Sequence, residues 1–429
     1  MRALKVTKDA RMTDAVVTAA AGAPATAAPV ASGQSRLLVP LLALGVFAII
    51  NTEMGVVGMV PLISDYFGVS IPAAGWSVTI FALVITLAGP TMPLLFSRLN
   101  RKYVLLGVLI IFVASCVVAA LTTSFALHLA TRALAALFHP VYVSLAFSLA
   151  AASVLPEERP KAIARIFMGV SAGMVLGVPA ASYIATELSY RAAMFFFAAS
   201  NGLVLVLTLL IVPSMPVVTA QSYGDQLQVL KRGVVWLSVG ATVFTNGSTF
   251  GFFSYFADFM ETLGGFTGAQ VSLALCLYGG ANIVGNLLAG KLLAVRPRLA
   301  VALTPWLVAA VILTLYAVIS ELMVALAVIV VFGIINGMIG NNCQYLMSKA
   351  APSAPELSNG LFLSSANCGT ALGTALCGLF IGSWGIAAAI IGALMMVVVS
   401  ATVNVLTLKA LARHERCGES ASQSDLACA

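Results

Sequence analysis

The segment 103–124 reads YVLLGVLIIFVASCVVAALTTS and contains no charged residue. Arg101 and Lys102 directly precede it. A helix of this length extends about 33 Å, which is enough to cross a hydrocarbon core of about 30 Å. The segment therefore predicts a membrane-spanning helix that begins beside a basic turn.

The rest of the chain repeats this pattern of long apolar runs between short polar turns. Of its 429 residues, 61% are hydrophobic and only 9% are charged, with a mean hydropathy of +1.04. Such a composition excludes a soluble fold, and in lipid a backbone satisfies its own polar groups most simply as a helix. We predict an all-α membrane protein with twelve spans, at 37–62, 75–97, 103–124, 126–153, 162–186, 193–212, 234–260, 270–293, 300–320, 322–348, 357–383 and 385–408.

The basic residues indicate how these spans are oriented. All but two of the 22 Lys and Arg residues fall in the two terminal segments and in alternate loops. Arg191 lies in an opposite loop and Arg132 lies inside a span. Because basic residues accumulate on the cytoplasmic side, both termini are predicted to be cytoplasmic, in a bacterial inner (plasma) membrane. The net charge of +7 is then a topology signal and does not indicate nucleic-acid binding.

The longest polar segments divide the chain. We predict a disordered cytoplasmic leader at 1–36, a six-helix bundle at 37–212, a central cytoplasmic loop at 213–233, a second six-helix bundle at 234–408 and a cytoplasmic tail at 409–429. The leader lacks the apolar segment and cleavage site of a signal peptide. Five of the seven cysteines fall within spans, so neither a disulfide nor a metal site is expected. No cofactor is implied.

The two groups of six spans resemble a duplicated unit. Span five carries Gly169, Gly173 and Gly177 at four-residue spacing, and span eleven carries Gly369 and Gly373. Small residues at this spacing form a stripe that lets a neighbouring helix approach closely. Ordinary tight packing explains these glycines by itself. Parallel repeats of six helices are nevertheless an architecture of transporters.

Two ionisable residues lie where ionisation is costly. Glu53 lies in the first span, about 13 Å from its outer end, and Arg132 lies about 9 Å deep in span four. Charged side chains at membrane depth are functional candidates. The two could meet across a cavity, where a carboxyl group whose exposure alternates could couple a proton to a cargo. The alternatives are a static buried ion pair and an arginine whose charged end snorkels to the membrane surface.

Further polar and aromatic residues lie near mid-depth. His139 shares one face of span four with Arg132, Asn246 and Phe250 lie in span seven, and Asn336 lies in span ten. We assign these four residues and Asn51 to a substrate cavity. The alternatives are hydrogen bonds between helices for the amides, a proton relay for the histidine and a lipid-facing or core position for the phenylalanine.

Four motifs resemble those of the major facilitator superfamily, in its twelve-span drug:proton antiporter branch of arabinose-efflux-permease-like and nucleoside-efflux-like exporters. Residues 51–61 (NTEMGVVGMVP) are similar to T-E-x-x-x-x-G-x-x-P, and residues 93–102 (PLLFSRLNRK) to G-x-x-x-D-R-x-G-R-K. Residues 132–139 (RALAALFH) resemble R-x-L-x-A-x-x-H, and residues 173–180 (GMVLGVPA) resemble the glycine-rich antiporter signature that ends in G-x-P.

The resemblance implies roles for individual residues. Glu53 would couple protons, and Arg132 would transfer protons or balance charge. Arg98, Arg101 and Lys102 would belong to a cytoplasmic gate between the halves. Gly173, Gly177 and Pro179 would belong to the antiporter motif. Pro93, Ser97 and Asn100 depart from the family pattern, and the aspartate missing at Ser97 removes a charge that helps to lock this gate.

These observations predict a secondary transporter. We expect a monomeric proton-coupled antiporter that exports a small organic molecule of the drug, sugar or nucleoside class by alternating access. Its partners would be this substrate, protons and the lipid bilayer. A proton symporter that imports a metabolite and an uncoupled facilitator are the alternatives. No nucleotide-binding loop, H-E-x-x-H pair or nucleophile motif is present in the sequence, which argues against an ATP-driven pump and against an enzyme.

Overall fold

The structure, a computed structural model, describes residues 35–217 and 223–427. The described residues form α-helices joined by short 3₁₀ helices and turns, and they contain no strand. Residues 1–34, 218–222 and 428–429 lie outside the described ranges. Most of the predicted leader and part of the predicted central loop fall there.

The first bundle contains α2 (Ser35–Met54), α3 (Val60–Phe67), α4 (Ile71–Ala74), α5 (Trp76–Ala88), α6 (Met92–Phe96), α7 (Arg101–Leu121), α8 (Phe125–Ala152), α9 (Arg159–Glu187) and α10 (Tyr190–Ile211). A short α11 (Tyr223–Leu227) precedes the second bundle. The second bundle contains α12 (Gly233–Phe253), α13 (Phe256–Gly264), α14 (Gly268–Val295), α15 (Pro297–Val318), α16 (Leu322–Ala350), α17 (Pro355–Trp384) and α18 (Ala389–Ala427).

Hydropathy and helix length confirm the membrane class. Within the described ranges, ten helical segments are long and apolar enough to cross a bilayer. The other two predicted spans are 75–97, which the structure divides into α5 and α6, and 234–260, which it divides into α12 and α13. The all-α fold of two helix bundles is therefore confirmed, and its twelve predicted spans are consistent with the structure.

Three predicted spans are interrupted instead of continuous. A 3₁₀ helix at Gly55–Met59 separates α2 from α3, and Pro61 occupies the first turn of α3. Gly89 and Pro90 lie between α5 and α6. Glycine lowers helix propensity and proline removes a backbone donor, so both interruptions have a local cause. The third break, after Phe253, contains neither residue.

The last helix extends further than the sequence predicted. We ended the final span at residue 408 because Lys409 follows it, but α18 continues as one helix to Ala427. A charged residue ends the apolar run without ending the helix, because lysine and arginine are good helix formers. Most of the predicted tail is therefore helical.

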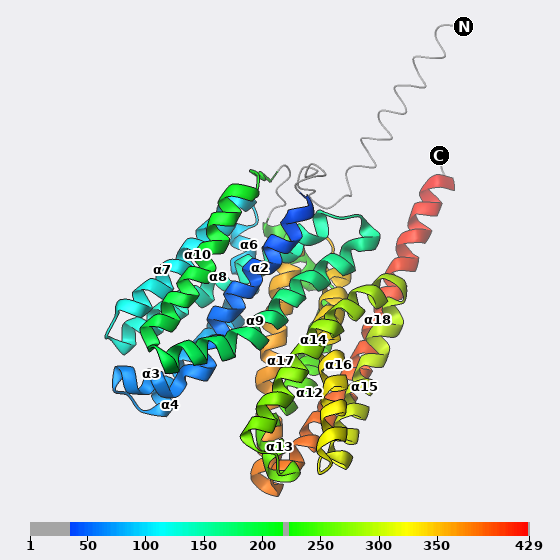
Figure 1. The fold of residues 1–429 in the computed structure, drawn as a ribbon. Helices are drawn as coiled ribbons and strands as arrows, with labels where there is room; N and C mark the ends of the chain where they lie inside the picture. Colours follow the sequence, from blue (N-terminus) through cyan, green and yellow to red (C-terminus); the bar gives the residue numbers. More distant parts are fainter. Residues whose placement is uncertain (1–34, 218–222, 428–429) are drawn as a thin grey trace, which may run out of the picture.

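The helices group into two bundles (Figure 1). In the first, α9 packs on α2, α7 on α10 and α5 on α8; in the second, α12 packs on α17 and α18, and α14 packs on α16. The bundles meet where α9 contacts α14 and where α17 contacts α5, α6 and α8. The start of α2 and the end of α18 lie on the same side of the molecule (Figure 1). We call this side, which carries the basic turn at Arg101, the basic end.

Candidate functional site

Glu53 lies in the last turn of α2, immediately before the 3₁₀ segment. Its side chain is buried, and its Oε2 atom lies 3.1 Å from Nε2 of His139 on α8. The ring of Phe81 lies edge-on to His139, with 6.0 Å between the ring centroids. The structure thus brings together two residues that the sequence assigned to different roles, the proton-coupling carboxylate and a cavity histidine.

Arg132 contacts the backbone around Glu53 and not its carboxylate. Its Nη1 atom donates to the carbonyl of Thr52 at 2.7 Å, and its Nη2 atom donates to the carbonyl of Glu53 at 3.1 Å. The last carbonyls of a helix lack intrahelical partners, and a cation at this end also opposes the helix dipole. Arg132 therefore acts as a cap on the interrupted helix α2.

The same guanidinium joins a third element of the first bundle. Its Nε atom donates to the carbonyl of Ser77 on α5 at 3.0 Å. Its Cζ atom lies 4.3 Å from the centroid of the Phe81 ring, a cation–π distance. Arg132 on α8 thus fixes the positions of α2 and α5 relative to each other. The sequence predicted that Glu53 and Arg132 would be neighbours, but not that the contact would be to the backbone.

His128 and Asn201 also belong to this site and were missed from the sequence. His128 is buried, with Nε2 3.0 Å from the Ser77 hydroxyl and Nδ1 2.9 Å from the Tyr190 hydroxyl. Nδ2 of Asn201 donates to the hydroxyl of Thr52 at 2.8 Å. The available signal was spacing, because His128 precedes Arg132 by four residues and shares its helix face.

The assigned cavity residues divide between the two bundles. Asn51 is fully buried against Gly177 of α9, and its amide has no hydrogen-bond partner within the described residues. In the second bundle, Nδ2 of Asn246 donates to the carbonyl of Thr242 at 3.0 Å. Asn336 is buried, and Phe250 packs against Phe253. Among the described residues, no hydrogen bond connects Asn51, Glu53 or His139 with Asn246 or Asn336.

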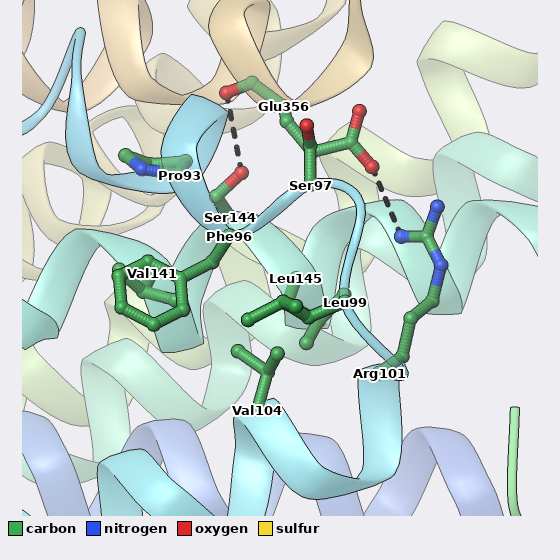
Figure 2. A pocket seen from close by; sticks show the side chains of 10 residues that line it. All are labelled: Pro93, Phe96, Ser97, Leu99, Arg101, Val104, Val141, Ser144, Leu145 and Glu356. Atoms are coloured by element: carbon green, nitrogen blue, oxygen red, sulfur yellow. Dashed lines mark hydrogen bonds and ion pairs between the residues drawn. The ribbon is translucent and has the colours of Figure 1, made fainter. Parts of the chain in front are cut away.

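The predicted gate residues lie at the basic end. Nη1 of Arg101, in the first turn of α7, lies 2.9 Å from Oε1 of Glu356, in the first turn of α17, and both side chains are buried. Figure 2 shows this ion pair, together with the hydrogen bond from Ser144 to the Glu356 carbonyl. Nζ of Lys102 instead donates to the carbonyl of Leu209 in its own bundle. Arg98 is exposed.

The two bundles are packed together beside these residues. The cavity beside Arg101 and Glu356 has a volume of about 10 Å³, enough for roughly one water molecule. Asn359 of α17 donates to the Ser144 carbonyl at 2.9 Å, and Ser364 donates to the Thr86 carbonyl at 2.8 Å. No hydrogen bond, ion pair or ring contact among the described residues joins the bundles at the opposite end. The halves therefore touch at the basic end.

The glycine stripes pack equivalent helices together in the two bundles. A Cβ atom on Gly169 would lie 2.2 Å from the carbonyl of Ala43, and Gly173 faces Ile50, so α9 packs closely on α2. A Cβ atom on Gly369 would lie 2.2 Å from the Val243 carbonyl, and one on Gly373 would lie 2.1 Å from that of Gly247. Span five on span one and span eleven on span seven are thus matching contacts. Pro179 lies exposed inside α9.

Comparisons with known proteins agree with this architecture. The model of the Major Facilitator Superfamily matches residues 42–356. The chain is 31% identical to the MFS-type transporter YtbD of Bacillus subtilis, over 83% of this chain and 91% of that protein. It is 27% identical to a chloramphenicol resistance protein of Streptomyces lividans, over 78% of this chain and 86% of that protein.

A solved structure has the same fold. The human organic anion transporter MFSD10 (TETRAN) superimposes with a TM-score of 0.71 at 18% identity, over 86% of this chain and 99% of that chain. The family model, the two relatives and the shared fold agree with one another. The chain belongs to the major facilitator superfamily and is a multi-pass membrane transporter.

Proposed function

We propose that this transporter is a proton-coupled antiporter that exports a small organic molecule by alternating access. The observation that carries the proposal is the Glu53–His139 pair. Glu53 is a buried carboxylate at a helix break, and its ionic partner is His139, whose imidazole can itself bind and release a proton. A carboxylate paired with a permanent cation would be less suited to exchanging protons.

In the proposed cycle, Glu53 binds a proton when its site opens to the outer side. Protonation removes the negative charge from the pair with His139, and the carboxyl group becomes easier to bury. Arg132 keeps the backbone of Thr52 and Glu53 in place through these changes, because its hydrogen bonds go to carbonyl oxygens that do not titrate. Release of the proton on the inner side would accompany the binding of cargo.

The direction and the cargo class rest on similarity. The chloramphenicol resistance protein of Streptomyces lividans is named for resistance to chloramphenicol, which supports export and a cargo of the drug class. Sugars and nucleosides remain candidates because of the motif resemblance. The cavity residues assigned from the sequence, Asn51, His139, Asn246, Phe250 and Asn336, offer amide, imidazole and aromatic contacts to such a molecule.

The remaining sequence predictions complete the proposal. The basic end faces the cytoplasm of a bacterial cell, so that both termini are cytoplasmic, and residues 213–233 link the two bundles. A monomer carries out transport. Arg101 and Glu356 then form the inner gate, and the closed basic end corresponds to a conformer that faces outward.

The test uses energised inverted membrane vesicles that contain a pH-sensitive dye. Drugs, nucleosides and sugars are added in turn, and release of protons from the vesicle lumen is recorded. Wild-type protein should give a signal that depends on the cargo, and Glu53→Gln should abolish it without reducing the amount of protein in the membrane. Glu261→Gln is the matched control, because Glu261 is exposed near the end of α13.

Other outcomes distinguish the alternatives. Movement of cargo without a proton signal in wild type would identify an uncoupled facilitator. A proton signal of the opposite sign would identify a symporter. Normal coupled transport by Glu53→Gln would show that the proton site lies elsewhere.

A further inference from the structure

Four uncharged side chains join the bundles at a deeper level than the gate. Ser171 of α9 belongs to the first bundle, whereas Asn282 and Asn286 of α14 and Asn341 of α16 belong to the second. Nδ2 of Asn286 donates to the Ser171 hydroxyl at 2.8 Å, and that hydroxyl donates to Oδ1 of Asn282. Nδ2 of Asn341 donates to Oδ1 of Asn286 at 2.7 Å. We call these four residues the amide cluster.

Glycines bring the backbones close enough for such short side chains to meet. A Cβ atom on Gly337 would lie 2.1 Å from the Asn282 carbonyl, so α14 and α16 are in backbone contact beside the cluster. A Cβ atom on Gly279 would lie 2.1 Å from the side chain of Val175, so α14 also lies close to α9. The hydrogen bonds of the cluster therefore depend on close contact between the two halves.

The cluster lies deep in the membrane-spanning part of the chain. Ser171 is twelve residues from the start of α9, or about 18 Å along the helix. Ser171, Asn286 and Asn341 are all buried. If the halves separated at the basic end, Ser171 would lose its partners in the second bundle, and the exposed amides would need water to replace them. Opening thus requires water to reach polar groups that are buried in the closed form.

We infer that the amide cluster is a latch that holds the basic end closed and sets the ratio of the two conformers of the transporter. It is separate from the Arg101–Glu356 ion pair, which lies in the first turns of α7 and α17. This inference rests on the alternating-access part of the proposed function, and it is independent of cargo and proton coupling.

The experiment measures how often the basic end opens. Ala164 is buried between the bundles, against Gly290 of α14, and Ala164→Cys would place a thiol there in a full-length chain whose seven native cysteines are replaced. The rate of alkylation by a water-soluble maleimide is proportional to the open population, even when that population is small. No cargo or pH gradient is present, so failure of the proposed coupling mechanism would not affect the result.

Ser171→Ala removes a single oxygen atom and should raise the alkylation rate about threefold to tenfold, the range expected for losing one or two interhelical hydrogen bonds in a membrane. Asn286→Ala should raise it similarly, and the double variant should show much less than the product of the two effects, because both changes remove the same bond.

Asn342→Ala is the control. Asn342 is a buried amide beside Asn341 on α16, but it donates to Thr304 at 2.7 Å, inside the second bundle. Its removal should leave the rate unchanged. An unchanged rate in Ser171→Ala, or an equal rise in Asn342→Ala, would overturn the inference. If Asn286→Ala does not fold, Ser171→Ala against Asn342→Ala still decides the question.

Discussion

Arg132 illustrates why residue type alone does not fix a role. A buried arginine near a buried glutamate suggests an ion pair, yet the guanidinium donates to three carbonyl oxygens, on Thr52, Glu53 and Ser77. The planar fork of five donors suits this task, since it reaches several acceptors at once. At this site the charge of Arg132 stabilises a helix end, and the carboxylate of Glu53 pairs with His139 instead.

This geometry predicts that lysine does not replace Arg132. Arg132→Lys keeps the positive charge, but its single ammonium group cannot match the fork that joins α2 to α5. We expect coupled transport to fall at least tenfold, because two hydrogen bonds from a charged group, each worth about 1.5–3 kcal/mol, are lost or distorted.

The measurement is the initial rate of cargo-driven proton release in vesicles of equal protein content. The control is Arg191→Lys, since Arg191 is exposed at the start of α10. Wild-type activity in Arg132→Lys would show that charge alone suffices at this position.

At the level of the helices, glycine stripes determine which elements come into contact. The backbones of α12 and α17 approach so closely that Gly373 has no room for a methyl group. Gly382, nine residues later on the same helix, has no atom within 4 Å of the position of a Cβ. Two glycines of the same helix therefore differ in their surroundings: Gly373 lies against a neighbouring backbone, and Gly382 faces open space.

Alanine at these two positions should have opposite effects. Gly373→Ala should lower the free energy of unfolding by about 1–3 kcal/mol, because its Cβ would overpack against the Gly247 carbonyl. Gly382→Ala should leave stability unchanged or raise it slightly, because alanine has the higher helix propensity. Thermal unfolding of the purified protein in detergent measures both. Equal melting temperatures would contradict the packing seen here.

At the scale of the whole molecule, the described parts of the two bundles meet at the basic end, at the Arg101–Glu356 pair, and further along α9 and α14, at the amide cluster. The Arg101–Glu356 ion pair holds this end closed, although Ser97 stands where the family pattern has an aspartate. Glu356 comes from the second bundle, so the charge that holds Arg101 lies across the interface. Closure therefore depends on residues that are 255 positions apart in the sequence.

Exchange of the two charges tests this closure. Glu356→Gln should increase opening of the basic end, because it leaves Arg101 buried without a counter-charge, which is strongly unfavourable. Arg101→Glu should have the same effect, and the double variant Arg101→Glu/Glu356→Arg should restore closure at least partly. The alkylation rate at Ala164→Cys reports the opening. Failure of the exchange to restore any closure would show that the pair is not the determining contact.

The amino-acid sequence by itself determined the membrane class, the helical content and the approximate position of each span, because hydropathy and helix length are local properties set by the bilayer. It also indicated Glu53 and Arg132, since ionisable residues in lipid are costly wherever they point.

The tertiary structure decided the contacts. It alone showed that His139 pairs with Glu53, that His128 and Asn201 join the site, that Asn341 belongs to an inter-bundle cluster and that Glu356 faces Arg101. The physical reason is that these contacts depend on the rotation of each helix about its axis and on how closely glycines let two helices approach. Both are set by the packing of segments far apart in the chain.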